Sequence, residues 1–301
     1  MIKDYSKLTH IKTYGSISYI CYPQNEDEVF KAYLYAEKNS LKPFPLGGGS
    51  NTLIGHSLSY FIISDINLKR VWEYESDIEV PEVTNSDTLN QKNLIISSNT
   101  NVSYLIMRAA MDGFGGLEFL AGLPAHLGGI VTMNAGNDGQ TISDFLEWIT
   151  IVDKDGEKKI YKKDIDFQYR HSNINGFITK VCVKLFKNDF SNNREINKTL
   201  HQKMIKQQII DRKRVQPIDM PNLGCFFKNP RKFPAGLLIE AAGLKGLKIG
   251  GAMVSQKHAN FLINTGEATF EDFILLIDRI KETVIEKFNI ALELEIRIVN
   301  G

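Results

Sequence analysis

The chain lacks most of the features that mark disulfide-rich, metal-binding and membrane proteins. Its 301 residues include only three cysteines, Cys21, Cys182 and Cys225, and no CxxC pair or Cys/His cluster occurs. A disulfide framework and a metal site are therefore not expected, and a reducing compartment suits the composition. The N-terminus has no apolar signal segment, and no apolar run approaches the roughly 18 residues that span a bilayer. These absences predict a cytoplasmic protein without membrane insertion.

An excess of charge of either sign is also missing. The formal net charge is +1, so the chain has no global field for gripping a nucleic-acid backbone or an anionic membrane. No helix-turn-helix pattern or basic stripe is present, which disfavours nucleic-acid binding. The hydrophobic content of 43% and the charged content of 24% are ordinary for a soluble globular enzyme. Any anionic ligand must therefore be held by a local group of donors.

At this length, two or three domains with real cores are expected. The cleanest helical periodicity runs from Thr269 to Phe288, where a capping box precedes one apolar stripe. The polar stretch 73–92 predicts an exposed hairpin or loop, and the stretch 187–194 predicts a linker. The same reasoning predicts further helices at about 25–39, 102–111 and 196–212, and strands at 19–22, 148–152, 158–162 and 178–186.

The two common nucleotide-binding fingerprints, GxGxxG and GxxxxGK[ST], are absent. Two other glycine clusters are present instead, LGGGSN at 46–51 and GLEFLAGLPAHLGG at 116–129, and MNAG at 133–136 follows. Closely spaced glycines let the backbone approach a ligand, and successive amide groups can form an anion-binding concavity. The clusters are therefore either sets of tight turns or a cradle for a diphosphate.

The stretch NLGCFFKNP at 222–230 places Cys225 beside a glycine and three residues before Lys228. A thiol in this setting could be a nucleophile, a metal ligand, a proton donor or a buried small hydrophobic group. The local sequence alone leaves these four roles open.

Taken in order, these motifs resemble those of the UDP-N-acetylenolpyruvoylglucosamine reductase family. LGGGSN, the 116–136 region, YRHS, NLGCFFKNP, AGLLIEAAGLKG with GGAMVSQKHANFLIN, and the terminal LELEIR carry the resemblance, which covers about Thr9 to Gly301. It implies an α+β fold, with an FAD-binding domain of the p-cresol methylhydroxylase type and a C-terminal α+β substrate domain. The implied boundaries are 1–190 for the FAD region, with subdomains of about 1–65 and 66–190, 195–292 for the UDP-sugar domain, and 293–301 for a tail that returns to the flavin.

The resemblance also implies a reaction. Family members use NADPH and non-covalent FAD to reduce UDP-N-acetyl-3-O-(1-carboxyvinyl)-glucosamine to UDP-N-acetylmuramate for peptidoglycan. Hydride comes from flavin N5, and the charge that develops beside the substrate carboxylate needs a cation, an acid and a proton donor. The matching residues are Arg170, Glu295 and Cys225, with Cys225 standing where the family usually has serine. We interpret Cys225 as the proton donor, and we expect Lys228 to raise its thiolate fraction.

Binding residues follow from the same matched motifs. His126 replaces the serine of the family's P-G-S-x-G-G and could itself donate to the diphosphate, and Leu294 replaces the proline of LEPE. The short interval between Arg170 and Arg214 resembles the shorter subtype of the family. The implied cofactor-binding residues are Gly47, Gly48, Gly49, Ser50, Asn51, Gly122, Pro124, Gly128, Gly129, Asn134 and Gly136, and the implied substrate-binding residues are Tyr169, Arg214, Gln216, Lys228 and Asn229.

Two alternative functions remain open. One is another oxidase or dehydrogenase on the same flavin fold, although LELEIR and NLGCFFKNP argue against it. The other is a catalytically idle protein that binds FAD or a UDP-sugar, which the replacement of serine by Cys225 favours.

Overall fold

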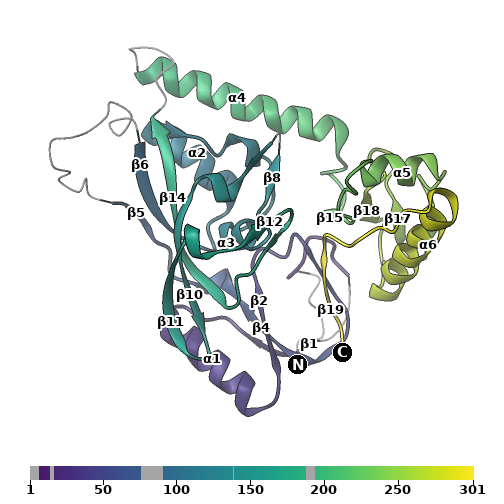
Figure 1. Cartoon of the computed structure of the whole chain (residues 1–301), viewed down its shortest axis with the longest axis horizontal. Coiled ribbons are helices and arrows are strands. Elements are labelled where there is room, and N and C mark those ends of the chain that lie inside the picture. Colours follow the sequence, from purple (N-terminus) through teal and green to yellow (C-terminus); the bar gives the residue numbers. More distant parts are fainter. Residues whose placement is uncertain (1–6, 14–16, 76–90, 138, 188–193) are drawn as a thin grey trace.

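The computed structural model describes residues 7–13, 17–75, 91–137, 139–187 and 194–301. It has a mixed α+β architecture (Figure 1). The helices are α1 (Glu26–Lys38), α2 (Val102–Asp112), α3 (Leu127–Thr132), α4 (Arg194–Val215), α5 (Ala235–Ala241) and α6 (Phe270–Phe288), with 3₁₀ turns η1 (Asp65–Asn67), η3 (Glu118–Leu120), η4 (Ile142–Asp144) and η5 (Lys162–Asp164).

A small parallel sheet lies near the N-terminus. Its order is β1-β4-β2, from β1 (Ile17–Cys21), β4 (Ser57–Ser64) and β2 (Lys42–Leu46). Helix α1 begins at Asn25, whose side chain accepts from the Glu28 amide, and it packs on this sheet. Because Val152 and Phe177 of the neighbouring sheet join the same core, α1 ties the two sheets together.

The largest sheet has the order β11-β10-β14-β6-β5, with β7 (Phe114–Gly115) paired to one end of β14. Its other strands are β11 (Gly156–Tyr161), β10 (Leu146–Asp153), β14 (Phe177–Lys187), β6 (Gln91–Ser97) and β5 (Trp72–Tyr74), all antiparallel. One continuous apolar core joins this sheet to α2 and α3. The loops that leave these helices are thereby fixed against a rigid support.

A four-stranded antiparallel sheet forms the C-terminal part, with the order β15-β18-β17-β16. Its strands are β15 (Asn222–Cys225), β18 (Phe261–Asn264), β17 (Ala252–Val254) and β16 (Lys248–Ile249). Helix α6 covers this sheet with its buried apolar face. The helix begins with a reciprocal capping box formed by Thr269 and Asp272. Asn289 ends α6 in the left-handed conformation.

Two connections join the parts of the molecule. Helix α4 runs along the large-sheet part, contacts α2 and η3, and leads towards β15 (Figure 1). The tail then comes back, and β19 (Arg297–Val299) pairs in parallel with β3 (Thr52–Ile54). Short pairs complete the structure: β8 (Gly136–Asn137) with β9 (Gln140–Thr141), and β12 (Phe167–Gln168) with β13 (His171–Ser172).

The four helices predicted by periodicity are confirmed, as are the four predicted strand regions. Helix α5 is not predicted from the sequence, since it has only seven residues, contains Gly236 and is followed by Gly243. Most of the polar stretch 73–92 and of the predicted linker 187–194 lies outside the described residues. Over the described ranges, no helix is long and apolar enough to cross a membrane, and no cluster of three or more His, Cys, Asp or Glu could hold a metal ion.

Candidate active site

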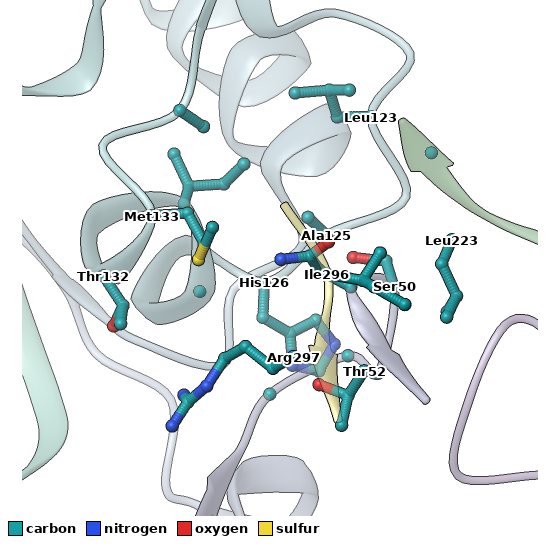
Figure 2. A pocket seen from close by; sticks show the side chains of 18 of the residues that line it. Ser50, Thr52, Leu123, Ala125, His126, Thr132, Met133, Leu223, Ile296 and Arg297 are labelled. Atoms are coloured by element: carbon teal, nitrogen blue, oxygen red, sulfur yellow. The ribbon is translucent and has the colours of Figure 1, made fainter. Parts of the chain in front are cut away.

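A cavity of about 1190 Å³ is lined by residues from both ends of the chain and from its middle (Figure 2). Such a volume exceeds the usual range for small-molecule pockets and suits a dinucleotide together with a substrate. The predicted site residues that line it are Gly47, Gly48, Gly49, Ser50, Asn51, Gly122, Pro124, Gly128, Gly129, Gly136, Arg170, Gln216, Cys225, Lys228, Asn229 and Glu295.

The glycine loop, residues 47–51, connects β2 to β3 at one wall of the cavity. Gly49 has a φ of +65°, and a Cβ there would collide with the carbonyl oxygen of Leu8. The His10 amide donates to the carbonyl oxygen of Gly49 at 3.0 Å, so the N-terminal segment braces the loop. Within the described part of the chain, the amides of Gly48, Gly49 and Ser50 donate to no protein acceptor. Adjacent unpaired amides at a cavity wall fit an anionic ligand such as a diphosphate.

A second wall comes from the glycines around α3. The Gly128 amide donates to the carbonyl oxygen of Ser98 at 2.8 Å, and a Cβ at Gly128 would lie 3.0 Å from the Ser98 Cβ. Gly122 has a φ of +81°, and a Cβ there would lie 3.3 Å from Arg212 Cδ. A Cβ at Gly129 would meet nothing within 4 Å. Close packing thus explains Gly128, while Gly129 keeps the cavity wall open.

Arg170 reaches the cavity from the two-residue turn between β12 and β13. Its φ of +55° is unusual for a residue with a side chain, and the turn requires it. Arg170 Nη2 donates to the carbonyl oxygen of Gly136 at 2.9 Å, and Arg170 Nε lies 3.3 Å from Glu295 Oε1. The Tyr169 ring lies beside the guanidinium, 5.3 Å from its central carbon. The cation is therefore held in one orientation beside an acid.

The tail brings Glu295 to the same place. The Glu295 amide donates to the carbonyl oxygen of Phe226 at 2.9 Å, which sets the tail next to the strand that carries Cys225. Asn51 of the glycine loop donates through Nδ2 to the Glu295 carbonyl oxygen at 3.2 Å, and it accepts from the Arg297 amide at 2.9 Å. One asparagine therefore links the glycine loop to the tail at Glu295 and at Arg297.

Burial and charge set the protonation of the acid and the thiol. Burial raises the pKa of Glu295, while the positive charges of Arg170 and Lys228 oppose the rise. Burial, and then the nearby Glu295 carboxylate, raises the pKa of Cys225 to about 12, against the lowering effect of Arg170. The expectation that Lys228 increases the thiolate fraction is therefore wrong, because Lys228 Nζ pairs instead with Glu293 Oε2 at 3.6 Å. The raised pKa keeps the Cys225 thiol protonated at neutral pH, and burial favours the protonated form of Glu295.

Polar side chains from the last turn of α4 and from the segments that follow α4 and β15 also line the cavity. Gln216, Lys228 and Asn229 lie there as predicted from the motifs, and Asn229 Oδ1 accepts from the Ala235 amide at 3.0 Å. Asn229 thus also anchors the start of α5. Arg212, which was not predicted, lines the cavity too, and its Nη2 donates to the Phe119 carbonyl oxygen at 3.3 Å.

Three predicted residues are not part of the lining: Asn134, Tyr169 and Arg214. Asn134 is buried, donates to the Gln168 carbonyl oxygen at 3.1 Å and accepts from the Ser143 amide at 3.4 Å, so it supports the wall from behind. Tyr169 is 52% exposed, and its ring lies 5.3 Å from the central carbon of the Arg170 guanidinium.

Other lining residues were missed by sequence reasoning. His126 was named from its motif, but its partner Asp65 was not: His126 Nδ1 lies 2.9 Å from the buried Asp65 carboxylate, which no local motif could reveal. Arg297 follows the predicted Glu295 by two residues and stacks over Phe44 at 4.3 Å. Alternation along the tail strand offered a signal for Arg297, since residues two apart point to the same side. His10 lines the cavity near the glycine loop.

The N-terminal half of the chain matches the family described as "FAD binding domain" over residues 17–159. The unpaired loop amides and the large cavity fit this cofactor, whose diphosphate is anionic. The fold and the site therefore define an FAD-containing oxidoreductase with a mixed α+β architecture.

Residues 216–299 match the family "UDP-N-acetylenolpyruvoylglucosamine reductase, C-terminal domain". Proteins named UDP-N-acetylenolpyruvoylglucosamine reductase are similar along almost the whole chain. That of Moorella thermoacetica is 34% identical over 288 residues, covering 94% of this chain and 87% of the relative. That of Clostridium novyi is 33% identical over 308 residues, covering 99% of this chain and 90% of the relative.

A crystal structure of the reductase of the same name from Thermus caldophilus is also similar. It has a TM-score of 0.75 and 27% sequence identity, and the match covers 98% of this chain and 97% of that one. The chain belongs to the UDP-N-acetylenolpyruvoylglucosamine reductase family.

Proposed function

We propose that the protein reduces the enol ether of UDP-N-acetyl-3-O-(1-carboxyvinyl)-glucosamine to the lactyl ether of UDP-N-acetylmuramate, a peptidoglycan precursor. NADPH is the proposed reductant. Bound FAD would supply the hydride chemistry, by accepting hydride from NADPH and passing it to the substrate's methylene carbon. The family relationship and the residues around the cavity support this proposal.

The observation that carries the proposal is the convergence of Arg170, Cys225 and Glu295 on one cavity. They come from a hairpin turn, a strand of the C-terminal sheet and the tail, and the closest pair is 3.3 Å apart. Hydride addition to an enol ether that bears a carboxylate creates negative charge at the adjacent carbon and carboxylate. A fixed cation and a neutral acid beside that position stabilise the charge.

Each residue then has a stated task. The Arg170 guanidinium faces the developing negative charge, and Glu295, in the protonated form that burial favours, donates a hydrogen bond to it. Cys225 Sγ–H gives its proton to the carbon that bears the carboxylate, and the resulting thiolate takes a proton back from solvent after product leaves. The raised pKa of Cys225 keeps this proton in place before the reaction, which is what a general acid requires.

The proposed reaction also assigns a task to each part of the chain. We propose that the region 1–190 holds the cofactor, that 195–292 holds the UDP-sugar, and that 293–301 carries the acid back to the flavin. Lys228, Gln216 and Arg212 are the proposed ligands of the nucleotide diphosphate and sugar, since point charges and amide donors suit phosphate oxygens.

Two half-reactions test the proposal. The protein with bound flavin is mixed anaerobically with NADPH, and the visible flavin absorbance should disappear. Adding the carboxyvinyl sugar nucleotide should restore the absorbance and yield UDP-N-acetylmuramate. Reduced flavin that reacts with oxygen or with other electron acceptors but not with this substrate would assign the protein to another flavin oxidase or dehydrogenase. Flavin that NADPH cannot reduce would indicate a binding protein without the activity.

A further inference from the structure

The pair formed by His126 and Asp65 is the strongest feature of the cavity that the proposed reaction leaves unused. His126 Nδ1 lies 2.9 and 3.0 Å from the two carboxylate oxygens of Asp65. Asp65 is 4% exposed, whereas the His126 side chain keeps 22% of its surface accessible. A histidine whose Nδ1 is held by a buried carboxylate has its other nitrogen, Nε2, fixed in direction.

That second nitrogen lies at the glycine loop. A Cβ built on Gly48 would lie 3.1 Å from His126 Cδ2 and 3.4 Å from His126 Nε2, and one on Gly47 would lie 3.5 Å from Asp65 Oδ2. Figure 2 shows the His126 ring in the middle of the lining side chains. Within the described ranges, Nε2 has no hydrogen-bond partner.

The loop amides and the histidine edge therefore face one volume. The amides of Gly48, Gly49 and Ser50 are unpaired donors at the cavity wall, and His126 Nε2 lies against Gly48. A ligand with several anionic oxygens would satisfy all of them, and the diphosphate of the cofactor is such a group.

We propose that His126 is a cofactor-binding residue that takes up a proton when FAD binds, and that Asp65 is the positioning residue that stabilises the resulting imidazolium. Before binding, His126 donates Nδ1–H to the Asp65 carboxylate and Nε2 is unprotonated. On binding, one proton from solvent is added at Nε2, and the new N–H donates to a diphosphate oxygen. The pair changes from a net charge of −1 to zero, which offsets the arriving negative charge.

The surroundings favour this change. Burial raises the pKa of Asp65, while its hydrogen bond to His126 and the positive charge of His126 oppose the rise, so protonation of His126 stabilises the Asp65 carboxylate. The other ionisable groups near the ring are His10, on the segment that braces the loop, and Arg297. Burial and then the charges of His126 and Lys12 lower the pKa of His10, so protonation of His10 is disfavoured when His126 is charged. The glycine loop and α3 contribute no ionisable side chain.

Calorimetric titration of the flavin-free protein with FAD, in buffers of different ionisation enthalpy, counts the protons taken up. For the wild type we expect an uptake approaching one proton per FAD within the range where histidines titrate, roughly pH 5 to 8. Flavin-fluorescence titration over the same range should show that the affinity for FAD weakens as pH rises. The weakening should reach at most about tenfold per pH unit, which is the limit for one linked proton.

Three variants assign the proton. His126→Gln keeps an amide near the position of Nε2 but cannot titrate, and Asp65→Asn keeps the shape while removing the negative charge. Both should bind FAD with little proton uptake and a nearly flat pH dependence. His10→Gln is the matched control, since it removes a titratable ring from the same cavity and should leave the uptake unchanged. If Asp65→Asn fails to fold, as judged from its thermal unfolding, His126→Gln decides alone.

The proposal rests on FAD binding but can fail separately from it. Wild-type protein that binds FAD without taking up a proton, or uptake that survives in His126→Gln, would overturn the role of the pair and leave the flavoenzyme assignment intact. If only His10→Gln loses the proton uptake, the proton binds to His10, and the proposed role of His126 and Asp65 is overturned. Flavin-free, folded protein that cannot bind FAD would count against both.

Discussion

The thiol of Cys225 should resist alkylation at neutral pH for an electrostatic reason. Its pKa is raised to about 12 from an ordinary value of 9.0. Since only the thiolate reacts, the reactive fraction at neutral pH is about a thousandfold lower than for an unperturbed thiol. Iodoacetamide labelling of Cys225 in the folded protein should therefore be slower than labelling of the unfolded chain by at least about this factor. Mass spectrometry of the peptide that contains Cys225 measures both rates.

Steric protection would also slow labelling, so the pH dependence and one variant separate the two causes. The rate should rise by about tenfold per pH unit through pH 9 without levelling off, because a raised pKa moves the plateau upward. Glu295→Gln removes a carboxyl group whose ionised form raises the pKa of Cys225, so at pH values where Glu295 is ionised this variant should be labelled faster than the wild type, although access is unchanged. A plateau near pH 9, or an unchanged rate in Glu295→Gln, would refute the reasoning that the thiol stores a proton.

Four further outcomes are expected. Cys225→Ser should keep substantial turnover. The flavin of Cys225→Ala should be reduced normally by NADPH but return hydride to substrate about 10²- to 10⁴-fold more slowly, as stopped-flow absorbance would show. Reoxidation of Cys225→Ala at the wild-type rate would remove the thiol from the mechanism. Because the pKa of Glu295 is raised, its neutral form is lost only as pH rises through that raised value, so reoxidation should decline at high pH, and Glu295→Gln should be slower but lack this decline. Gly49→Ala adds left-handed strain of roughly 1–2 kcal/mol and a backbone collision, so purified protein should carry little flavin and melt at a lower temperature; normal flavin content would contradict the role of the loop. Arg212→Ala should raise the KM for the sugar nucleotide at least about tenfold. Arg214→Ala, the matched control outside the lining, should leave this KM unchanged. A raised KM in Arg214→Ala and an unchanged one in Arg212→Ala would show that Arg214, as the sequence predicted, binds the substrate.

The sequence was most informative where local physics or an ordered set of motifs decided the outcome. The stripe and capping box of α6 follow from residues within one helix, and the glycine loop was identified from consecutive residues. Cys225 and Glu295 could be named because the order of motifs resembled a family.

What could not be predicted depends on contacts between distant residues. Asp65 and His126 are 61 positions apart, and no pattern within either segment indicates that a carboxylate lies beneath the histidine. The choice between Arg212 and Arg214 depends on the rotational phase of α4, which a basic helix end does not reveal. The raised pKa of Cys225 comes from burial and from a carboxylate that arrives on the tail, so Lys228 was given an influence that belongs to Glu295.

The two hydrogen bonds of Asn51 have a consequence for how the enzyme is assembled. Its side chain holds the residue that carries the acid, its carbonyl oxygen holds Arg297, and its own backbone continues the glycine loop. A shift of the loop would therefore reach the backbone of Glu295 through one side chain. Damage to the loop is then expected to disturb an acid 244 positions further along the chain, so cofactor binding and alignment of the acid depend on the same asparagine.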